Sequence, residues 1–127
     1  EAKWAVFPAG GSTVRLPVQI PFAKAMELLL TGDLISAAEA QSIGFLNYVV
    51  AADQVLAKAM EIAEKIAANG PLAVKAIRKS VRACLGKPEQ EALRIESELS
   101  GPVFQTEDAR EGPRAFMEKR KPQYQGR

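Results

Sequence analysis

The sequence predicts a mainly α-helical chain that carries one short β-strand. Apolar residues recur at helical spacing through most of the chain, and Gly and Pro divide it into segments of helix length. Only residues 45–50 (Phe-Leu-Asn-Tyr-Val-Val) are rich enough in aromatic and β-branched residues to form a strand. No internal period indicates a solenoid. A lone strand needs a sheet to join, so a partner chain or a missing part of this chain should supply that sheet.

Helix boundaries follow from capping residues and from Gly and Pro. Ser12 or Thr13 is suited to cap a short first helix, which should end at Leu16, before Pro17. A Ser-Ala-Ala-Glu capping box begins the third helix, Asp53 should cap the fourth, and a Thr should cap the last. Seven helices are expected in all, over residues 12–16, 21–31, 37–43, 54–68, 71–85, 88–99 and 107–121.

The composition limits the chemistry that this chain can perform. Its 127 residues are enough for one domain. The composition is typical of a globular protein, with 47% hydrophobic and 25% charged residues. The absence of histidine excludes a Ser-His-Asp triad, a Cys-His dyad and any His-ligated metal within the chain. The single cysteine, Cys84, forms no internal disulfide or zinc cage and is expected to be a small buried hydrophobe. Acid/base work would therefore fall to Asp, Glu, Lys or Tyr, with no metal site expected.

The chain shows no sign of membrane insertion or export. No apolar run approaches the roughly 18 residues that a membrane span needs, and no signal-peptide pattern stands at the start. We therefore expect a cytoplasmic protein without a membrane partner. The chain begins at Glu1 rather than Met, which favours a processed product or a piece of something longer.

The net charge of +2 hides an uneven distribution. Residues 110–127 carry six basic and two acidic side chains, so this end is the natural place to meet an anion such as a phosphate. A second basic group forms one stripe at helical spacing, made of Lys75, Arg78, Lys79 and Arg82. The stripe is compatible with nucleic acid, but no aromatic platform or recognition motif accompanies it. A solvated helix face is the preferred interpretation, and no nucleic-acid partner is expected.

Several segments together resemble the C-terminal half of the enoyl-CoA hydratase/isomerase family, the crotonase superfamily. Residues 8–16 (Pro-Ala-Gly-Gly-Ser-Thr-Val-Arg-Leu) are similar to the family loop Pro-Gly-x-Gly-Gly-Thr-x-Arg-Leu. The Glu-Leu-Leu-Leu-Thr-Gly run at 27–32 and the segments 36–50 and 67–79 follow in the family's order. Residues 106–127 match the family's ending almost position by position. Each motif is weak alone, but their shared order and spacing over the whole chain make the resemblance specific.

The resemblance implies a divided architecture. Residues 1–50 would be the end of the α/β crotonase core, with an active-site loop, helices and one strand, and residues 51–127 would be a C-terminal helical trimerisation region. The family is about twice this length, so its N-terminal half, a ββα spiral core, would be absent here or present as a separate chain. That half would supply the sheet, both N–H donors of the oxyanion hole and one of two catalytic glutamates. The expected assembly is a homotrimer or a dimer of trimers.

The resemblance also assigns an acid/base residue and a loop that positions water. Glu1 lies seven residues before Pro8, the spacing at which hydratases of this family carry their second glutamate. Pro8, Ala9 and Gly10 match the loop that positions substrate and water, where the backbone amide at Ala9 would help to hold the attacking water. Ala9 replaces a family glycine, so this contact depends on its backbone conformation. Alternatively, Glu1 is a frayed, solvated terminal residue. Trp4 would lie near the acyl pocket, where it either narrows the pocket or simply packs.

Two residues near the C-terminus match positions that contact coenzyme A from a neighbouring subunit. Phe116 would pack on the adenine, and Lys119 would pair with a phosphate as a mobile point charge. The alternative is a solvated basic end of the last helix, where cations are favoured in any case.

The function that the resemblance implies is hydration or dehydration of a 2-enoyl-CoA thioester. The acyl-CoA would be the substrate, and no metal or redox cofactor would take part. Two alternatives stay open: a non-catalytic member that binds acyl-CoA, and an inactive helical oligomerisation fragment.

Overall fold

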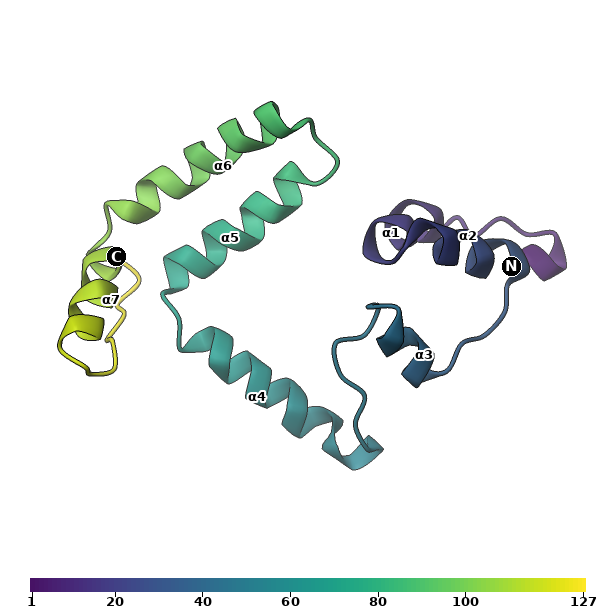
Figure 1. Ribbon diagram of the computed structural model, residues 1–127, viewed down its shortest axis with the longest axis horizontal. Coiled ribbons are helices and arrows are strands. Elements are labelled where there is room, and N and C mark those ends of the chain that lie inside the picture. The colour runs from purple at the N-terminus through teal and green to yellow at the C-terminus, as the bar shows by residue number, and fades with distance from the viewer. The chain divides into compact units, whose positions relative to one another are not determined.

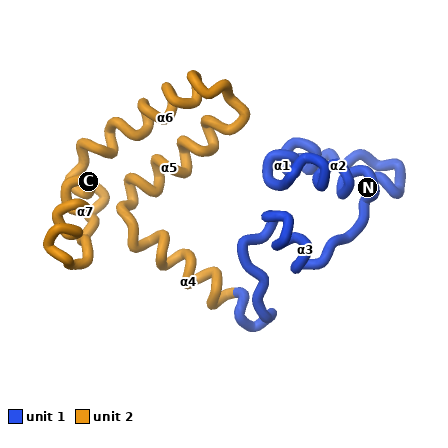
Figure 2. Tube along the Cα trace, viewed as in Figure 1, with its two compact units in different colours: residues 1–55 blue, residues 56–127 orange.

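The computed structural model describes residues 1–127 and contains seven α-helices and two 3-10 helices (Figure 1). It divides into two compact units, Glu1–Val55 and Leu56–Arg127 (Figure 2). The mainly α-helical prediction is confirmed. The predicted strand is wrong, because no part of the chain forms a β-strand.

The first unit is built around a pair of helices, α1 and α2, which pack against each other (Figure 1). Ile20, in the turn that joins them, and Ala25 are buried. An exposed ion pair of 2.6 Å between Lys3 Nζ and Asp33 Oδ1 links the N-terminal turn to the end of α2. The elements of this unit are η1 (Ala2–Trp4), α1 (Ser12–Gln19), α2 (Phe22–Thr31), α3 (Ala37–Ser42) and η2 (Ala52–Gln54).

The predicted ends of α2 and α3 are confirmed. Gly32 ends α2 in the left-handed conformation, with φ 64°, which glycine adopts without a steric penalty. Ser36 and Glu39 form the expected capping box at α3. Ser36 Oγ accepts a hydrogen bond from Glu39 N at 3.2 Å, and Ser36 N donates to Glu39 Oε2 at 2.8 Å. These local bonds satisfy backbone donors that the helix leaves unpaired.

Helix α1 differs from the prediction at both ends. Its N-cap is Gly11, with φ 96°, and neither of the two hydroxyl residues that follow makes a capping hydrogen bond. The helix also continues through Pro17 to Gln19. A proline removes only one intrahelical hydrogen bond, and Ile20 N still donates to Leu16 O at 3.2 Å, so the last turn remains closed.

The segment 45–50 lacks the pairing that would make it a strand. Phe45 N and Leu46 N both donate to Ala40 O, at 2.9 and 3.1 Å, so the backbone first turns back on α3. The remaining residues have no regular structure and no ladder partner. Strand formation requires hydrogen bonds to a neighbouring strand, and this chain supplies none.

The second unit contains four helices: α4 (Val55–Ala67), α5 (Pro71–Cys84), α6 (Glu89–Phe104) and α7 (Glu107–Met117). Helices α5 and α6 lie side by side as a hairpin, and the end of α6 leads directly to α7 (Figure 1). Pro71 begins α5 at its first position and Thr106 caps α7, accepting from Ala109 N at 3.1 Å; both were predicted.

Three further helix boundaries, from the start of α4 onward, are corrected. Asp53 lies inside η2 and makes no capping bond to α4. Helix α6 runs past the expected end near Leu99 to Phe104, because Pro102, like Pro17, removes a single hydrogen bond that the helix tolerates. Helix α7 ends at Met117, four residues before the expected end.

Very little of this chain is buried. Its buried hydrophobic residues are Ile20, Ala25, Ala40 and Ala115, whereas twenty-four large hydrophobic residues are exposed. The accessible surface is 10085 Å². Two separate globules that share this mass would expose about 8,000 Å². The helices therefore present about 2,000 Å² of surface beyond what two separate globules of this mass would expose. None of the seven α-helices combines the length and the hydropathy that a membrane span requires.

Candidate functional site

Glu1 is anchored in the first unit by its backbone. Its carbonyl oxygen accepts hydrogen bonds from Trp4 N at 2.9 Å and from Val6 N at 3.1 Å. Ala5 closes this turn in the left-handed conformation, with φ 54°. The carboxylate itself is exposed and forms no ion pair or hydrogen bond. The turn therefore fixes the backbone of Glu1 and leaves its acid group available.

The loop from Pro8 to Gly10 follows this turn in the same unit. Pro8 is half-buried, and Ala9 and Gly10 are exposed. The Ala9 N–H donates to Phe7 O at 2.8 Å, so holding a water with this amide requires that bond to be shared or replaced. The loop then delivers the chain into α1 through the left-handed Gly11, where a Cβ would lie 2.7 Å from Arg15 Nη2.

Two large apolar side chains in and next to the Glu1 turn are mostly exposed. Trp4 is 83% exposed and Phe7 is 70% exposed. Trp4 therefore does not pack within this chain. The Glu1 turn and the loop present an uncovered apolar surface beside an unpaired carboxylate.

In the second unit, the structure brings Phe116 and Lys119 together on one turn at the end of α7. Lys119 has φ 54°, a conformation that usually requires glycine at this position. Two backbone hydrogen bonds close the turn: Lys119 N donates to Phe116 O at 3.1 Å, and Arg120 N donates to Ala115 O at 3.0 Å. Phe116 is 82% exposed, and the Lys119 ammonium has no acidic partner. An aromatic ring and an unpaired cation are thus presented three residues apart.

A buried carboxylate supports this turn. Glu111 is only 7% exposed and lies on α7. Its Oε2 accepts from Arg114 Nη2 at 2.6 Å and from Arg120 Nη2 at 3.0 Å, and its Oε1 accepts from Arg120 Nη1 and, at 3.0 Å, from Gln123 N. Arg120, then Arg114 and the Gln123 amide, hold the pKa of Glu111 well below its usual range. The sequence placed Glu111 in the segment that resembles the family's ending but gave it no role, since its partners are one backbone amide twelve residues away and two arginine side chains three and nine residues away.

The C-terminal tail folds back along α7 through a second buried carboxylate. Asp108 Oδ1 accepts from Gln125 N at 2.7 Å, and its Oδ2 accepts from Gly126 N at 2.8 Å. The Asp108 N–H in turn donates to Arg127 O at 3.0 Å. The tail is therefore an ordered part of the α7 region.

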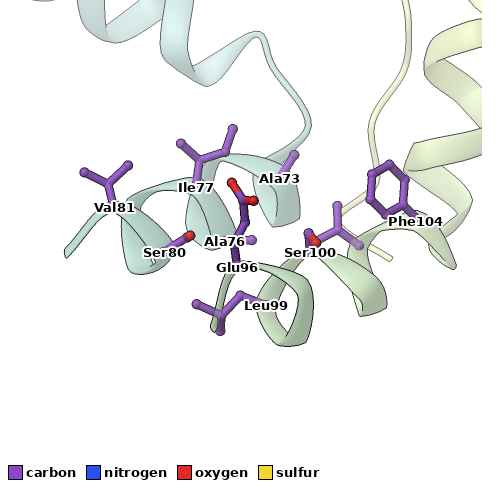
Figure 3. Close-up of a pocket in the computed structure, with 10 residues that line it drawn as sticks. Ala73, Ala76, Ile77, Ser80, Val81, Glu96, Leu99, Ser100 and Phe104 are labelled. Carbon is purple, nitrogen blue, oxygen red and sulfur yellow. The ribbon is translucent and has the colours of Figure 1, made fainter. Parts of the chain in front are cut away.

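A further apolar groove lies between α5 and α6. Ile77 and Val81 line it from α5, and Leu99 and Phe104 line it from α6 (Figure 3). Its volume is about 310 Å³. No three His, Cys, Asp or Glu side chains are grouped so that they could hold a metal ion.

Comparison with known proteins identifies the family. The sequence profile of the family described as enoyl-CoA hydratase/isomerase matches residues 1–127. The chain belongs to the enoyl-CoA hydratase/isomerase family.

Relatives and solved structures agree with this assignment. Over 127 residues the chain is 53% identical to enoyl-CoA hydratase EchA19 of Mycobacterium tuberculosis, covering 100% of this chain and 48% of the relative. It is 38% identical over 131 residues to carnitinyl-CoA dehydratase of Salmonella typhi, covering 100% of this chain and 50% of that protein. The crystal structure of enoyl-CoA hydratase EchA1 from Mycobacterium marinum matches with a TM-score of 0.94 and 40% identity, over 100% of this chain and 50% of the other.

The chain spans about half the length of the curated relatives it matches. It corresponds to their C-terminal part, and its helices match the helical C-terminal part of the crotonase fold. The sequence had predicted that the chain matches the C-terminal half of the family and the helical part of its fold, and both predictions are confirmed.

Proposed function

We propose that this chain is the C-terminal part of an enzyme that adds water to, or removes it from, a 2-enoyl-CoA thioester. The observation that carries the proposal is the 53% identity to an enoyl-CoA hydratase over all 127 residues. The dehydratase among the relatives fits the same proposal, since removal of water is the reverse of its addition.

The reaction needs two carboxyl groups and a stabilised enolate. One carboxylate takes a proton from water while the water oxygen bonds to the β-carbon. A carboxylic acid gives a proton to the α-carbon, and the thioester oxygen carries negative charge between these events. The reaction is redox-neutral. Carboxyl groups transfer the protons, and N–H donors stabilise the negative charge on the thioester oxygen. We therefore propose that neither a metal nor a redox cofactor takes part.

We assign Glu1 as one of the two acid/base groups. Its unpaired carboxylate and its hydrogen-bonded backbone turn support this role. The exposed Trp4 and Phe7 would enclose the carboxylate once a second surface covers them. Pro8, Ala9 and Gly10 would position the water and the acyl group, with the Ala9 amide released from Phe7 O.

We assign Phe116 and Lys119 to coenzyme A. The exposed ring offers a face for the adenine, and the unpaired ammonium suits a phosphate. Both lie in the part of the chain that carries the excess of positive charge.

We also propose that the chain works in an assembly, which the uncovered surface supports. An excess of about 2,000 Å² falls in the range of obligate interfaces. The N-terminal half, in the same polypeptide or as a separate chain, would cover part of it, and a homotrimer or a dimer of trimers would cover more. We expect this assembly to act in the cytoplasm.

A hydration assay of the assembled protein with crotonyl-CoA tests the proposal. Glu1→Gln keeps the side-chain size and removes the acid, so turnover should fall by about 10²–10⁴-fold while coenzyme A binding persists. Undiminished turnover in this variant would contradict the role of Glu1. Binding of coenzyme A without any turnover by the wild type would favour the non-catalytic alternative. Native mass spectrometry of the same sample would show whether an N-terminal half is present.

A further inference from the structure

The turn that presents Lys119 is connected through Arg120 to two carboxylates, the exposed Glu118 and the buried Glu111. Arg120, the next residue along, has its backbone N–H bonded to Ala115 O at 3.0 Å and its guanidinium on Glu111. Ala115 is fully buried, so the backbone end of this connection is fixed to the helix. Glu111 lies nine residues before Arg120 and is also buried. Both the backbone and the side chain of Arg120 are therefore tied to α7.

We propose that Glu111 is a positioning residue for coenzyme A, acting through Arg120 on the Lys119 turn. This inference rests on the proposed function, in which Lys119 and Phe116 contact the nucleotide end of the coenzyme. Nothing in the family resemblance or in the sequence motifs assigned a role to Glu111.

The physical reason is the backbone conformation of Lys119. A residue with a Cβ adopts φ 54° only when its surroundings impose it. Here the surroundings are the two backbone bonds of the turn and the guanidinium clamp. Without the clamp, the left-handed turn becomes one of several conformations, and the ammonium and the ring no longer point in fixed directions.

Affinity then falls in proportion to the population of the competent turn. If the released turn is competent about a tenth of the time, the dissociation constant rises about tenfold. The acid/base chemistry lies in the other unit and does not use this turn. The effect should therefore appear in the binding of the nucleotide and not in the chemical step.

The test compares two substrates of the assembled enzyme. Crotonyl-CoA carries the nucleotide, whereas the crotonyl thioester of N-acetylcysteamine lacks it and cannot reach Lys119. In Glu111→Gln we expect the KM for crotonyl-CoA and the Kd for coenzyme A to rise about tenfold, with kcat within about twofold. The kcat/KM for the truncated substrate should not change.

Glu107→Gln is the matched control on the same helix. Its carboxylate pairs with Arg127 at 2.9 Å, both side chains are exposed, and neither is connected to the Lys119 turn. This variant should bind coenzyme A as the wild type does. In the Lys119→Ala background, Glu111→Gln should add almost nothing to the loss of coenzyme A affinity, since its effect passes through Lys119.

Several results would overturn the inference. Equal losses with both substrates would show that Glu111 only stabilises the fold. If Glu111→Gln binds coenzyme A as the wild type does and Lys119→Ala binds it more weakly, then Glu111 does not position the turn, and the proposed function stands. If the wild type does not bind coenzyme A, both the positioning role of Glu111 and the proposed function are refuted. If Glu111→Gln fails to assemble, Arg120→Lys replaces it, because it keeps the charge and loses the two-pronged contact; the same split between substrates is expected.

Discussion

Replacing Lys119 with glycine should stabilise the folded protein and weaken its binding of coenzyme A. The left-handed conformation with φ 54° costs a residue with a Cβ about 1–2 kcal/mol, and glycine avoids this cost. Glycine also loses more conformational freedom on folding, which offsets about 0.5–1 kcal/mol of the gain. The free energy of unfolding should therefore rise by about 0.5–1 kcal/mol in Lys119→Gly.

Lys119→Ala is the matched variant, since it removes the same side chain and keeps the Cβ. It should weaken coenzyme A binding as Lys119→Gly does, without the gain in stability. Urea unfolding followed by circular dichroism gives the midpoints, and calorimetric titration of the same samples gives the dissociation constants. Equal midpoints for the two variants would refute the claim that this turn is strained. If both variants bind coenzyme A with the affinity of the wild type, Lys119 is not part of the coenzyme A site.

Further predictions concern capping and acid stability. Ser36→Ala removes the acceptor for Glu39 N and should cost about 1 kcal/mol, seen as faster hydrogen exchange of the α3 amides; unchanged exchange would contradict the capping role. Thr106→Ala should cost a similar amount, about 1 kcal/mol, at the start of α7. The lowered pKa of Glu111 means that the unfolded chain binds its proton more readily, so its contribution to stability is present above pH 4.5 and is lost as the pH falls further. Urea midpoints measured from pH 7 to pH 3 should therefore fall less steeply in Glu111→Gln than in the wild type, and equal slopes would argue against the Glu111 cluster.

Features that depend on neighbouring residues were predictable from the sequence. The capping box of Ser36 and Glu39, the glycine end of α2 at Gly32 and the cap at Thr106 each need only a few consecutive residues. Their hydrogen bonds form within one helical turn, so the amino-acid types at fixed spacing are sufficient to predict them.

Features that depend on distant partners were not predictable in this way. Residues 45–50 have the composition of a strand, but a strand exists only when another strand pairs with it. Proline was given too much weight as a helix breaker at Pro17, since α1 continues through it to Gln19.

In the candidate site, too, the features set by neighbouring residues were predictable and those set by distant partners were not. The loop from Pro8 to Gly10 and the Phe116 and Lys119 pair could be selected by motif, because each is a short stretch of sequence. The role of Glu111 depends on Arg120 and on the Gln123 amide, and a backbone amide has no signature in the sequence. Only the folded geometry brings these groups together.

The large uncovered surface also determines how the stability of this protein should be measured. With four buried hydrophobic residues, the chain gains little free energy from its own core, so in the proposed assembly most of the free energy of folding would come from the surfaces that cover it. Where those surfaces belong to other subunits, folding and association form one equilibrium. The melting temperature would then rise with protein concentration, and dilution alone would unfold the chain.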